Sequence, residues 1–244
     1  MNFTQPTPQQ ITILKFLRVE TCSTPSIIQT LLKQKTVQAS YQILNRMVTQ
    51  KLLSKYTLCV LSGRGVLLFG ITNLGLAYAF DLEETAVFRP TFQPSKISAV
   101  TLQHKFDIQM IHIKALHNGW SNWKDGSQLG LRSRDHKVPD AVATSQANER
   151  VAFEVEREIK SHRRYSDIIL SHLLARKLGH WDSIIYLCPT SDMSLRLKRV
   201  FENLGSVNFN GKKIKLSSEH VQCFKFYGYD EFIKKIEMSF NETP

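Results

Sequence analysis

Three acidic side chains near the middle of the chain have types and a spacing that suit metal-assisted chemistry. Asp140 directly follows a proline, and Glu154 and Glu156 stand two residues apart in a run of alternating residues, Val151 to Glu156. In a β-strand, that alternation places both glutamates on one face and the apolar side chains on the other. Like charges on one strand face repel, so a divalent cation or basic side chains must offset them.

The residues around Asp140 predict a second strand that pairs with the first. Residues 138–143 form a short apolar run, and Asn148-Glu149 suits a turn between the two strands. Pairing would bring Asp140 beside Glu154. Oxygen ligands of this kind suit Mg²⁺ or Mn²⁺, which activate water and stabilise charge on a phosphoryl oxygen. The alternative is a solvated acidic strand face.

We therefore expect Asp140, Glu154 and Glu156 to be metal ligands and, together with Lys160, catalytic residues. A helix is expected from about 157 to 178, and its first turns would bring Lys160 and Arg164 near a phosphate. Lys160 could equally form only a surface salt bridge with Glu156. The same helix carries Tyr165, which we expect to support the site by stacking or hydrogen bonding rather than to act as the nucleophile.

The composition indicates a polyanionic partner. The 244 residues include 32 Lys and Arg against 21 Asp and Glu, a formal charge of +11. Such a surplus favours nucleic acid or an anionic membrane surface. No run approaches the roughly 20 apolar residues that cross a bilayer, and the N-terminus lacks a signal-peptide pattern. Four scattered cysteines suit a reducing compartment. We expect a cytoplasmic protein with no membrane insertion.

The first third of the chain is the more purely basic part, with eight Lys and Arg and two acids in residues 1–82. Helical patterns near 8–17, 25–32 and 36–48 precede β-rich runs at 56–61 and 66–71, which predict a hairpin. This order resembles the winged helix-turn-helix over residues 7–80, and the resemblance implies DNA binding through the third helix and the wing. A protein–protein module with solvated charges is the alternative.

The resemblance assigns two groups of DNA-binding residues. Polar side chains of the third helix would reach base edges or phosphates; they are Gln38, Ser40, Gln42, Asn45 and Arg46. Basic residues beyond that helix would contact phosphates; they are Lys51, Lys55 and Arg64. Pro90 and Pro94 then mark a connector. The expected domains are residues 1–82, a linker at 83–100, and a second domain at 101–244.

The second domain resembles the PD-(D/E)xK, or restriction-endonuclease-like, nucleases. The resemblance rests on Pro139-Asp140 followed by the strand with Glu154 and Glu156. A helix at 101–116, strands near 120–156, a strand at 181–188 and a helix at 192–204 complete an αβββαβ order. The expected fold class is α+β, a winged helix followed by this nuclease-like domain. The position that is usually lysine is Glu156, and Lys160 is the candidate replacement.

The combination of both domains resembles the MobC-type (MOBC) plasmid relaxases over essentially the whole chain. The runs His104–Asp107 and Glu154–Tyr165 carry this resemblance. It implies a bacterial endonuclease that nicks double-stranded DNA at a plasmid origin of transfer, depends on a divalent metal and works beside a coupling or accessory mobilization protein. It also raises His104 and Asp107 to supporting residues.

Two other functions stay open from the residues. The chain could be a non-enzymatic DNA-binding regulator of plasmid replication or mobilization whose nuclease-like domain is inactive. It could also be a type II restriction endonuclease, which would form a dimer and cut both strands. The sequence leaves open the oligomeric state, the recognised DNA sequence and the choice between Mg²⁺ and Mn²⁺.

Overall fold

The computed structural model describes residues 5–59, 63, 65–81, 90–130, 138–209 and 211–241, and it is a mixed α+β structure. The chain divides into two compact units, Met1–Ile113 and Lys114–Pro244. The division falls inside helix α5 (Leu102–His117). Within the described ranges, no helix combines the length and the apolar character needed to span a membrane.

The division between the units differs from the boundary expected at residues 83–100. Leu102 of α5 is buried in one apolar cluster with Cys22, Leu68 and Phe92. Ile113 is buried with the helices of the first unit. The early turns of α5 therefore pack as part of the first unit, because their apolar side chains complete its core. Residues 83–89 of the expected linker lie outside the described residues.

The first unit consists of helices around a small antiparallel sheet. Its elements are α1 (Pro8–Glu20), β1 (Cys22–Ser23), α2 (Pro25–Leu31), α3 (Val37–Thr49), β2 (Leu53–Cys59), β3 (Gly65–Ile71), α4 (Asn73–Ala77) and a 3-10 turn η1 (Pro94–Lys96). Thr7, Thr24 and Thr36 begin the three main helices, because each hydroxyl accepts a hydrogen bond from a backbone N–H of the first turn. The sheet order is β1-β3-β2, with Leu53 opposite Ile71.

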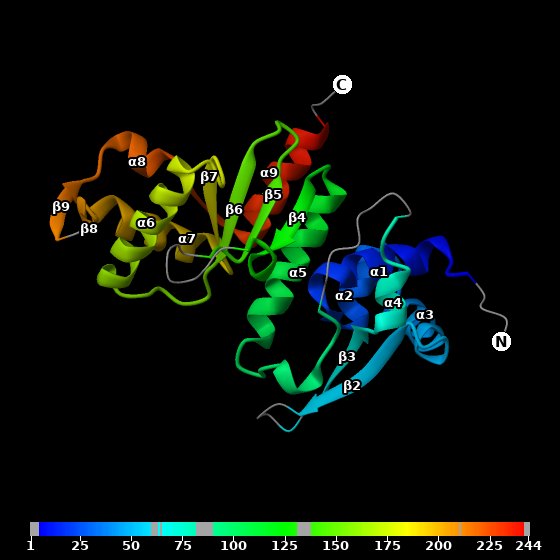
Figure 1. The fold of residues 1–244 in the computed structure, drawn as a ribbon. Coiled ribbons are helices and arrows are strands. Elements are labelled where there is room, and N and C mark those ends of the chain that lie inside the picture. The colour runs from blue at the N-terminus through cyan, green and yellow to red at the C-terminus, as the bar shows by residue number, and fades with distance from the viewer. Residues whose placement is uncertain are drawn as a thin grey trace. The chain divides into compact units, whose positions relative to one another are not determined.

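The second unit is built on a five-stranded mixed sheet (Figure 1). After α5 come β4 (Ser121–Asp125), the 3-10 turn η2 (Gly126–Gln128), β5 (Ala141–Thr144), β6 (Arg150–Val155), α6 (His162–Lys177), β7 (Ser183–Cys188), α7 (Ser191–Asn203), β8 (Ser206–Phe209), β9 (Lys212–Lys215), α8 (Ser218–Gln222), β10 (Phe224–Gly228) and α9 (Tyr229–Asn241). The sheet order is β10-β7-β6-β5-β4. Strands β4, β5 and β6 pair antiparallel, whereas β6, β7 and β10 pair parallel.

Both faces of β6 are buried. On one face, Phe153 contacts the rings of Trp120, Trp123 and Phe232, with Phe232 coming from α9. On the other face, Ala152 belongs to the core that α6 and α7 cover. The sequence predicts the glutamates on the face opposite Phe153, and that placement is confirmed. That face is nevertheless not exposed, since α6 lies over it.

Gly126 positions the start of β5. Its N–H donates to the carbonyl of Asp140 over 2.9 Å, and a Cβ at Gly126 would lie 2.0 Å from the carbonyl oxygen of Pro139. The chain around Asp140 therefore approaches η2 so closely that a side chain at position 126 has no room.

We expect Gly126→Ala to destabilise the second unit by about 1–3 kcal/mol, because the methyl group forces the backbone at Pro139 to shift. Urea unfolding followed by tryptophan fluorescence measures this, since all three tryptophans lie in that unit. Gly205→Ala is the matched control, because nothing lies within 4 Å of its added Cβ. Equal unfolding free energies for the two variants would contradict the close approach.

Candidate active site

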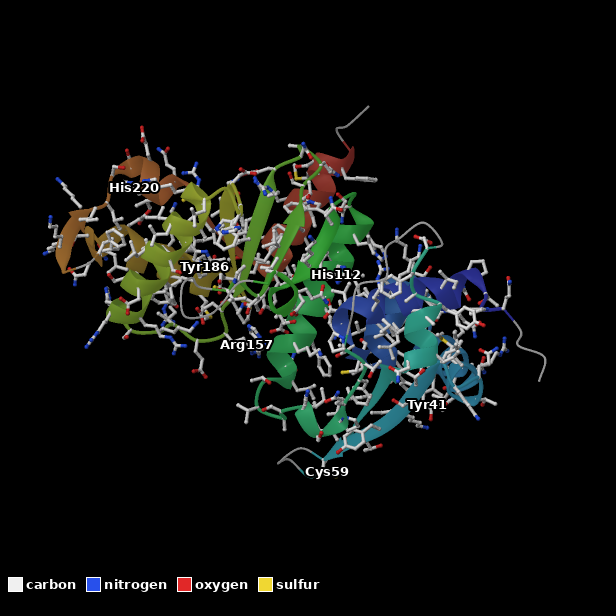
Figure 2. The ribbon with its side chains drawn as sticks, viewed as in Figure 1. Tyr41, Cys59, His112, Arg157, Tyr186 and His220 are labelled. Atoms are coloured by element: carbon white, nitrogen blue, oxygen red, sulfur yellow. The ribbon has the colours of Figure 1, made fainter. Side chains whose placement is uncertain are left out.

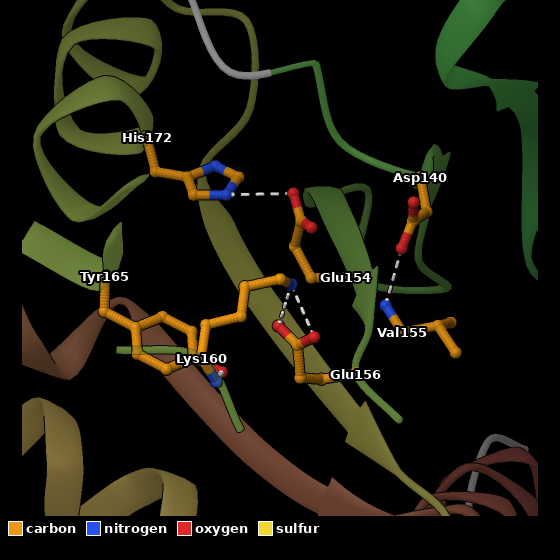
Figure 3. A network of polar contacts seen from close by, with 7 residues as sticks. All are labelled: Asp140, Glu154, Val155, Glu156, Lys160, Tyr165 and His172. Carbon is orange, nitrogen blue, oxygen red and sulfur yellow. Dashed lines mark hydrogen bonds and ion pairs between the residues drawn. The ribbon is translucent and has the colours of Figure 1, made fainter. Parts of the chain in front are cut away.

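The register of β5 and β6 brings Asp140 and Glu154 to adjacent positions. Ala141 pairs with Phe153, and the Asp140 N–H donates to the Phe153 carbonyl over 3.0 Å. Asp140 therefore stands opposite Glu154 at the end of the ladder, as expected from the sequence. Its carboxylate Oδ2 accepts a hydrogen bond of 2.7 Å from the N–H of Val155 (Figure 3). This contact fixes the Asp140 carboxylate at the carboxyl end of β6.

Glu154 points from β6 toward α6. Its Oε1 lies 3.1 Å from Nε2 of His172, and both residues are buried (Figure 3). The His172 ring contacts the rings of Trp181, Tyr186 and Phe224, which restricts its orientation. Burying a carboxylate is costly unless a donor reaches it, so the His172 contact makes the buried position of Glu154 tolerable.

His172 is a buried residue of the site that was not among the candidates from the sequence. It is fully buried, and it stands seven residues after Tyr165, which is also fully buried. Seven residues are two helical turns, so the two side chains share the face of α6 that covers the sheet. This spacing is the sequence signal that could have identified His172.

Glu156 pairs with Lys160. The Lys160 ammonium lies 2.5 Å from each oxygen of the Glu156 carboxylate, and Glu156 is only 5% exposed. Lys160 was expected on a helix beginning near Arg157, but α6 begins at His162, with Ser161 as its N-cap. Lys160 therefore reaches Glu156 from the segment that precedes the helix. A cation does lie beside Glu156, although from a different element than the sequence predicts.

Two buried tyrosines border the carboxylates. The hydroxyl of Tyr165 accepts a hydrogen bond from the Lys160 N–H over 3.2 Å. Burial raises the pKa of Tyr165, and the charge of Glu156 raises it further. A phenol that keeps its proton is a poor nucleophile, so this geometry suits the supporting role expected of Tyr165.

Tyr186 of β7 was not identified from the sequence. It lies inside the second unit (Figure 2), and its hydroxyl is buried without a hydrogen-bond partner among the described residues. Its pKa is raised well above the usual range by burial, and then by the charges of Glu154, Glu156 and Asp140. Tyr186 therefore lies near enough to all three carboxylates for their charges to disfavour its phenolate.

The donor atoms of this cluster suit a hard divalent cation, since carboxylate oxygens are the preferred ligands of Mg²⁺ and Mn²⁺. The side-chain orientations do not converge, however. In the part of the chain that the structure describes, no three His, Cys, Asp or Glu side chains are grouped closely enough to hold a metal ion. A cation at Asp140 and Glu154 would have to compete with the Val155 N–H and with His172. The chemistry of the donors fits, and their present rotamers do not.

The remaining expected residues are Arg164 of the second unit and His104 and Asp107 of α5. Arg164 is exposed on the first turn of α6. His104 and Asp107 belong to the turns of α5 that pack with the first unit, and Asp107 accepts a hydrogen bond from Gln103 over 3.0 Å. The structure does not place these two residues in the carboxylate cluster.

In the first unit, α3 presents most of the polar residues that were expected to bind DNA. Gln38, Gln42 and Arg46 are exposed, and Asn45 is half-buried. Ser40 is the exception and a correction, because it is fully buried and its hydroxyl donates to Gln34. It stands four residues before the buried Leu44, on the same helix face, so it cannot reach a ligand.

The basic residues beyond α3 are also largely accessible. Lys51 and Lys55 are exposed. Lys55 donates to the Tyr41 hydroxyl over 3.0 Å and lowers the pKa of that phenol. Arg64 lies outside the described residues. Apart from Ser40, every expected DNA-binding residue that the structure describes has a side chain at least partly open to solvent.

Comparisons of the chain with protein-family models, with curated proteins and with solved structures give no match.

The Glu156–Lys160 pair yields a stability prediction. We expect Lys160→Met to lower the unfolding free energy by about 1–3 kcal/mol, because it leaves a buried carboxylate without its cation. The double variant Glu156→Gln with Lys160→Met should recover part of that loss. Lys198→Met is the matched control: Lys198 pairs with Glu202 at the same spacing, but both side chains are about half exposed. The unfolding free energies are measured by urea unfolding. Equal losses for Lys160→Met and Lys198→Met would show that the Glu156–Lys160 pair is not buried.

Proposed function

We propose that this chain is a divalent-cation-dependent DNA endonuclease that nicks one strand at a plasmid origin of transfer, as a relaxase similar to the MobC type does. One observation carries the proposal. The order α5-β4-β5-β6-α6-β7 is the αβββαβ order of the PD-(D/E)xK nucleases, and it brings Asp140, Glu154 and Glu156 to one end of β6. The +11 charge and the first unit support DNA as the substrate.

The first unit supports a DNA-docking role. Its helices α1, α2 and α3 followed by the β2–β3 hairpin have the order of a winged helix. In this proposal α3 enters the major groove, where the exposed Gln38, Gln42 and Arg46 reach base edges or phosphates. Lys51 and Lys55 would contact the backbone, which fixes the position of the protein on DNA without specifying sequence.

The carboxylates of the second unit would carry out the cleavage. Asp140 and Glu154 would hold the cation, and a bound Mg²⁺ or Mn²⁺ supplies Lewis acidity toward the phosphate and favours deprotonation of water. Glu156 would accept a proton from the attacking water. Lys160 would orient Glu156 through their ion pair and bring positive charge toward the phosphate as negative charge develops on it.

In-line attack by water would break the bond to the 3′ oxygen, leaving a 3′-hydroxyl and a 5′-phosphate. Tyr165 takes no covalent part in this scheme, since its hydroxyl is buried against the Lys160 backbone. It supports the site by holding the segment that carries Lys160. A single site acting once would nick the duplex rather than cut both strands.

The proposal predicts metal-dependent nicking that needs the carboxylates. A supercoiled plasmid carrying the native origin region of this protein is incubated with Mg²⁺, Mn²⁺ or EDTA, and open circles are measured on agarose gels. We expect Asp140→Asn and Glu154→Gln to lower nicking at least about 100-fold, because altering groups that merely support metal ligands already costs about 10–100-fold. Both variants keep the shape of the side chain and should still bind the DNA.

The control is Asp167→Asn, which removes an exposed carboxylate of α6 outside the cluster. It should nick as the wild type does. Supercoiled plasmid that is shifted but never nicked by the wild type would favour the non-enzymatic regulator. Linear product would favour a restriction endonuclease, and a product whose mobility changes on protease treatment would indicate a tyrosyl link.

A further inference from the structure

The β8–β9 hairpin is an amphipathic ribbon that the cleavage scheme does not use. The two strands pair antiparallel, with Val207 opposite Ile214 and Asn208 opposite Lys213, and Gly211 turns between them at φ 76°. Figure 1 shows the hairpin at one margin of the second unit, beside α6 and α7. Alternation along each strand gives the ribbon two distinct faces.

The inner face of the ribbon packs toward α6. Val207 is buried in the core that contains Tyr165 and Ile169. Phe209 and Ile214 line a groove together with apolar residues of α6, which are Leu170, Leu173 and Leu174. Val207 is therefore buried against the protein, whereas Phe209 and Ile214 stay 36% and 39% exposed at the groove. These three residues define the inner face of the ribbon, and the opposite face points away from α6.

The outer face is basic and polar. By alternation and register it carries Ser206 opposite Lys215 and Asn208 opposite Lys213. Both lysine side chains are exposed, and neither ammonium group forms an ion pair or hydrogen bond with any described residue. The sequence holds no acidic residue between Glu202 and Glu219. Adjacent unpaired cations repel one another, so an anion bound here would relieve a real electrostatic cost.

We propose that this outer face binds the phosphate backbone of nucleic acid and so gives the second unit its own DNA contact. Lys213 and Lys215 stand two residues apart on one strand face, about 7 Å, and offer two separate charges to successive phosphates. The Asn208 amide adds a neutral donor of the kind that also contacts phosphates. This inference depends on the proposed function in one respect, which is that the nucleic acid is DNA.

The composition of the outer face favours nucleic acid over an anionic membrane. Proteins that bind the membrane interface insert apolar or aromatic side chains beside their basic residues. Here Val207 is buried, and the partly exposed Phe209 and Ile214 lie on the inner face, at the groove beside α6. The outer face offers charge and hydrogen bonds alone, which is what a phosphate backbone requires.

The salt dependence of DNA binding by the full chain tests this contact. Fluorescence anisotropy with a labelled 30-base-pair duplex in EDTA, where no cleavage occurs, gives the association constant at several salt concentrations. Each phosphate contact contributes about 0.9 to the slope of log K against log salt. We expect the Lys213→Gln and Lys215→Gln double variant to have a slope smaller in magnitude by about 1.8.

The matched control is Lys198→Gln with Lys234→Gln, which removes the same charge from exposed positions on α7 and α9. It should leave the slope within a few tenths of the wild type.

Equal changes in both double variants would overturn the assignment, because net charge alone would then explain them. Loss of binding to anionic vesicles but not to DNA in the ribbon variant would also overturn it. A wild type that never nicks plasmid, yet shows the expected slope difference, refutes the proposed cleavage and leaves the ribbon contact standing.

Discussion

The burial of two glutamates on one face of β6 is the constraint on which the second unit depends. Glu154 and Glu156 are each about 95% buried and stand two residues apart, so neither can be left without a donor. His172 comes from the middle of α6 and Lys160 from the segment before it. The position and start of α6 are thus tied to the two carboxylates, and α6 in turn covers the sheet.

The same constraint separates the roles of the two glutamates. Glu156 has a flexible cation that is partly open to solvent, whereas Glu154 has a rigid imidazole held among aromatic rings. Asp140 is fixed by the backbone N–H of Val155. In the division of labour that we propose, Asp140 and Glu154 exchange these partners for a cation, and Glu156 exchanges a proton.

Much of the framework could be predicted from the sequence, because local signals mark it. Threonine caps and prolines begin the first helices, and alternation reveals β6. The pairing of β5 with β6 followed from a turn signal between two short apolar runs. The two-residue strand β1 could not be predicted, since it exists only by pairing with Gly70 and Phe69 of β3.

The partners of the site residues were harder to predict, because they depend on tertiary packing. Residue type does not distinguish the buried His172 from an exposed histidine, and Ser40 is polar yet lies on the buried face of α3. Lys160 was expected on a helix, but Ser161 caps α6 one residue later. In each case the neighbouring element, and not the residue type, decides which way the side chain points.

Direct measurement of Mn²⁺ binding tests whether Asp140 and Glu154 bind a divalent cation, without any assumption about the DNA substrate. Free Mn²⁺ is followed by electron paramagnetic resonance while the full chain is titrated, for the wild type and for the double variant Asp140→Asn with Glu154→Gln. Circular dichroism verifies that both are folded. We expect saturable binding by the wild type that the double variant loses. Equal binding by both proteins, or none by the wild type, would contradict it.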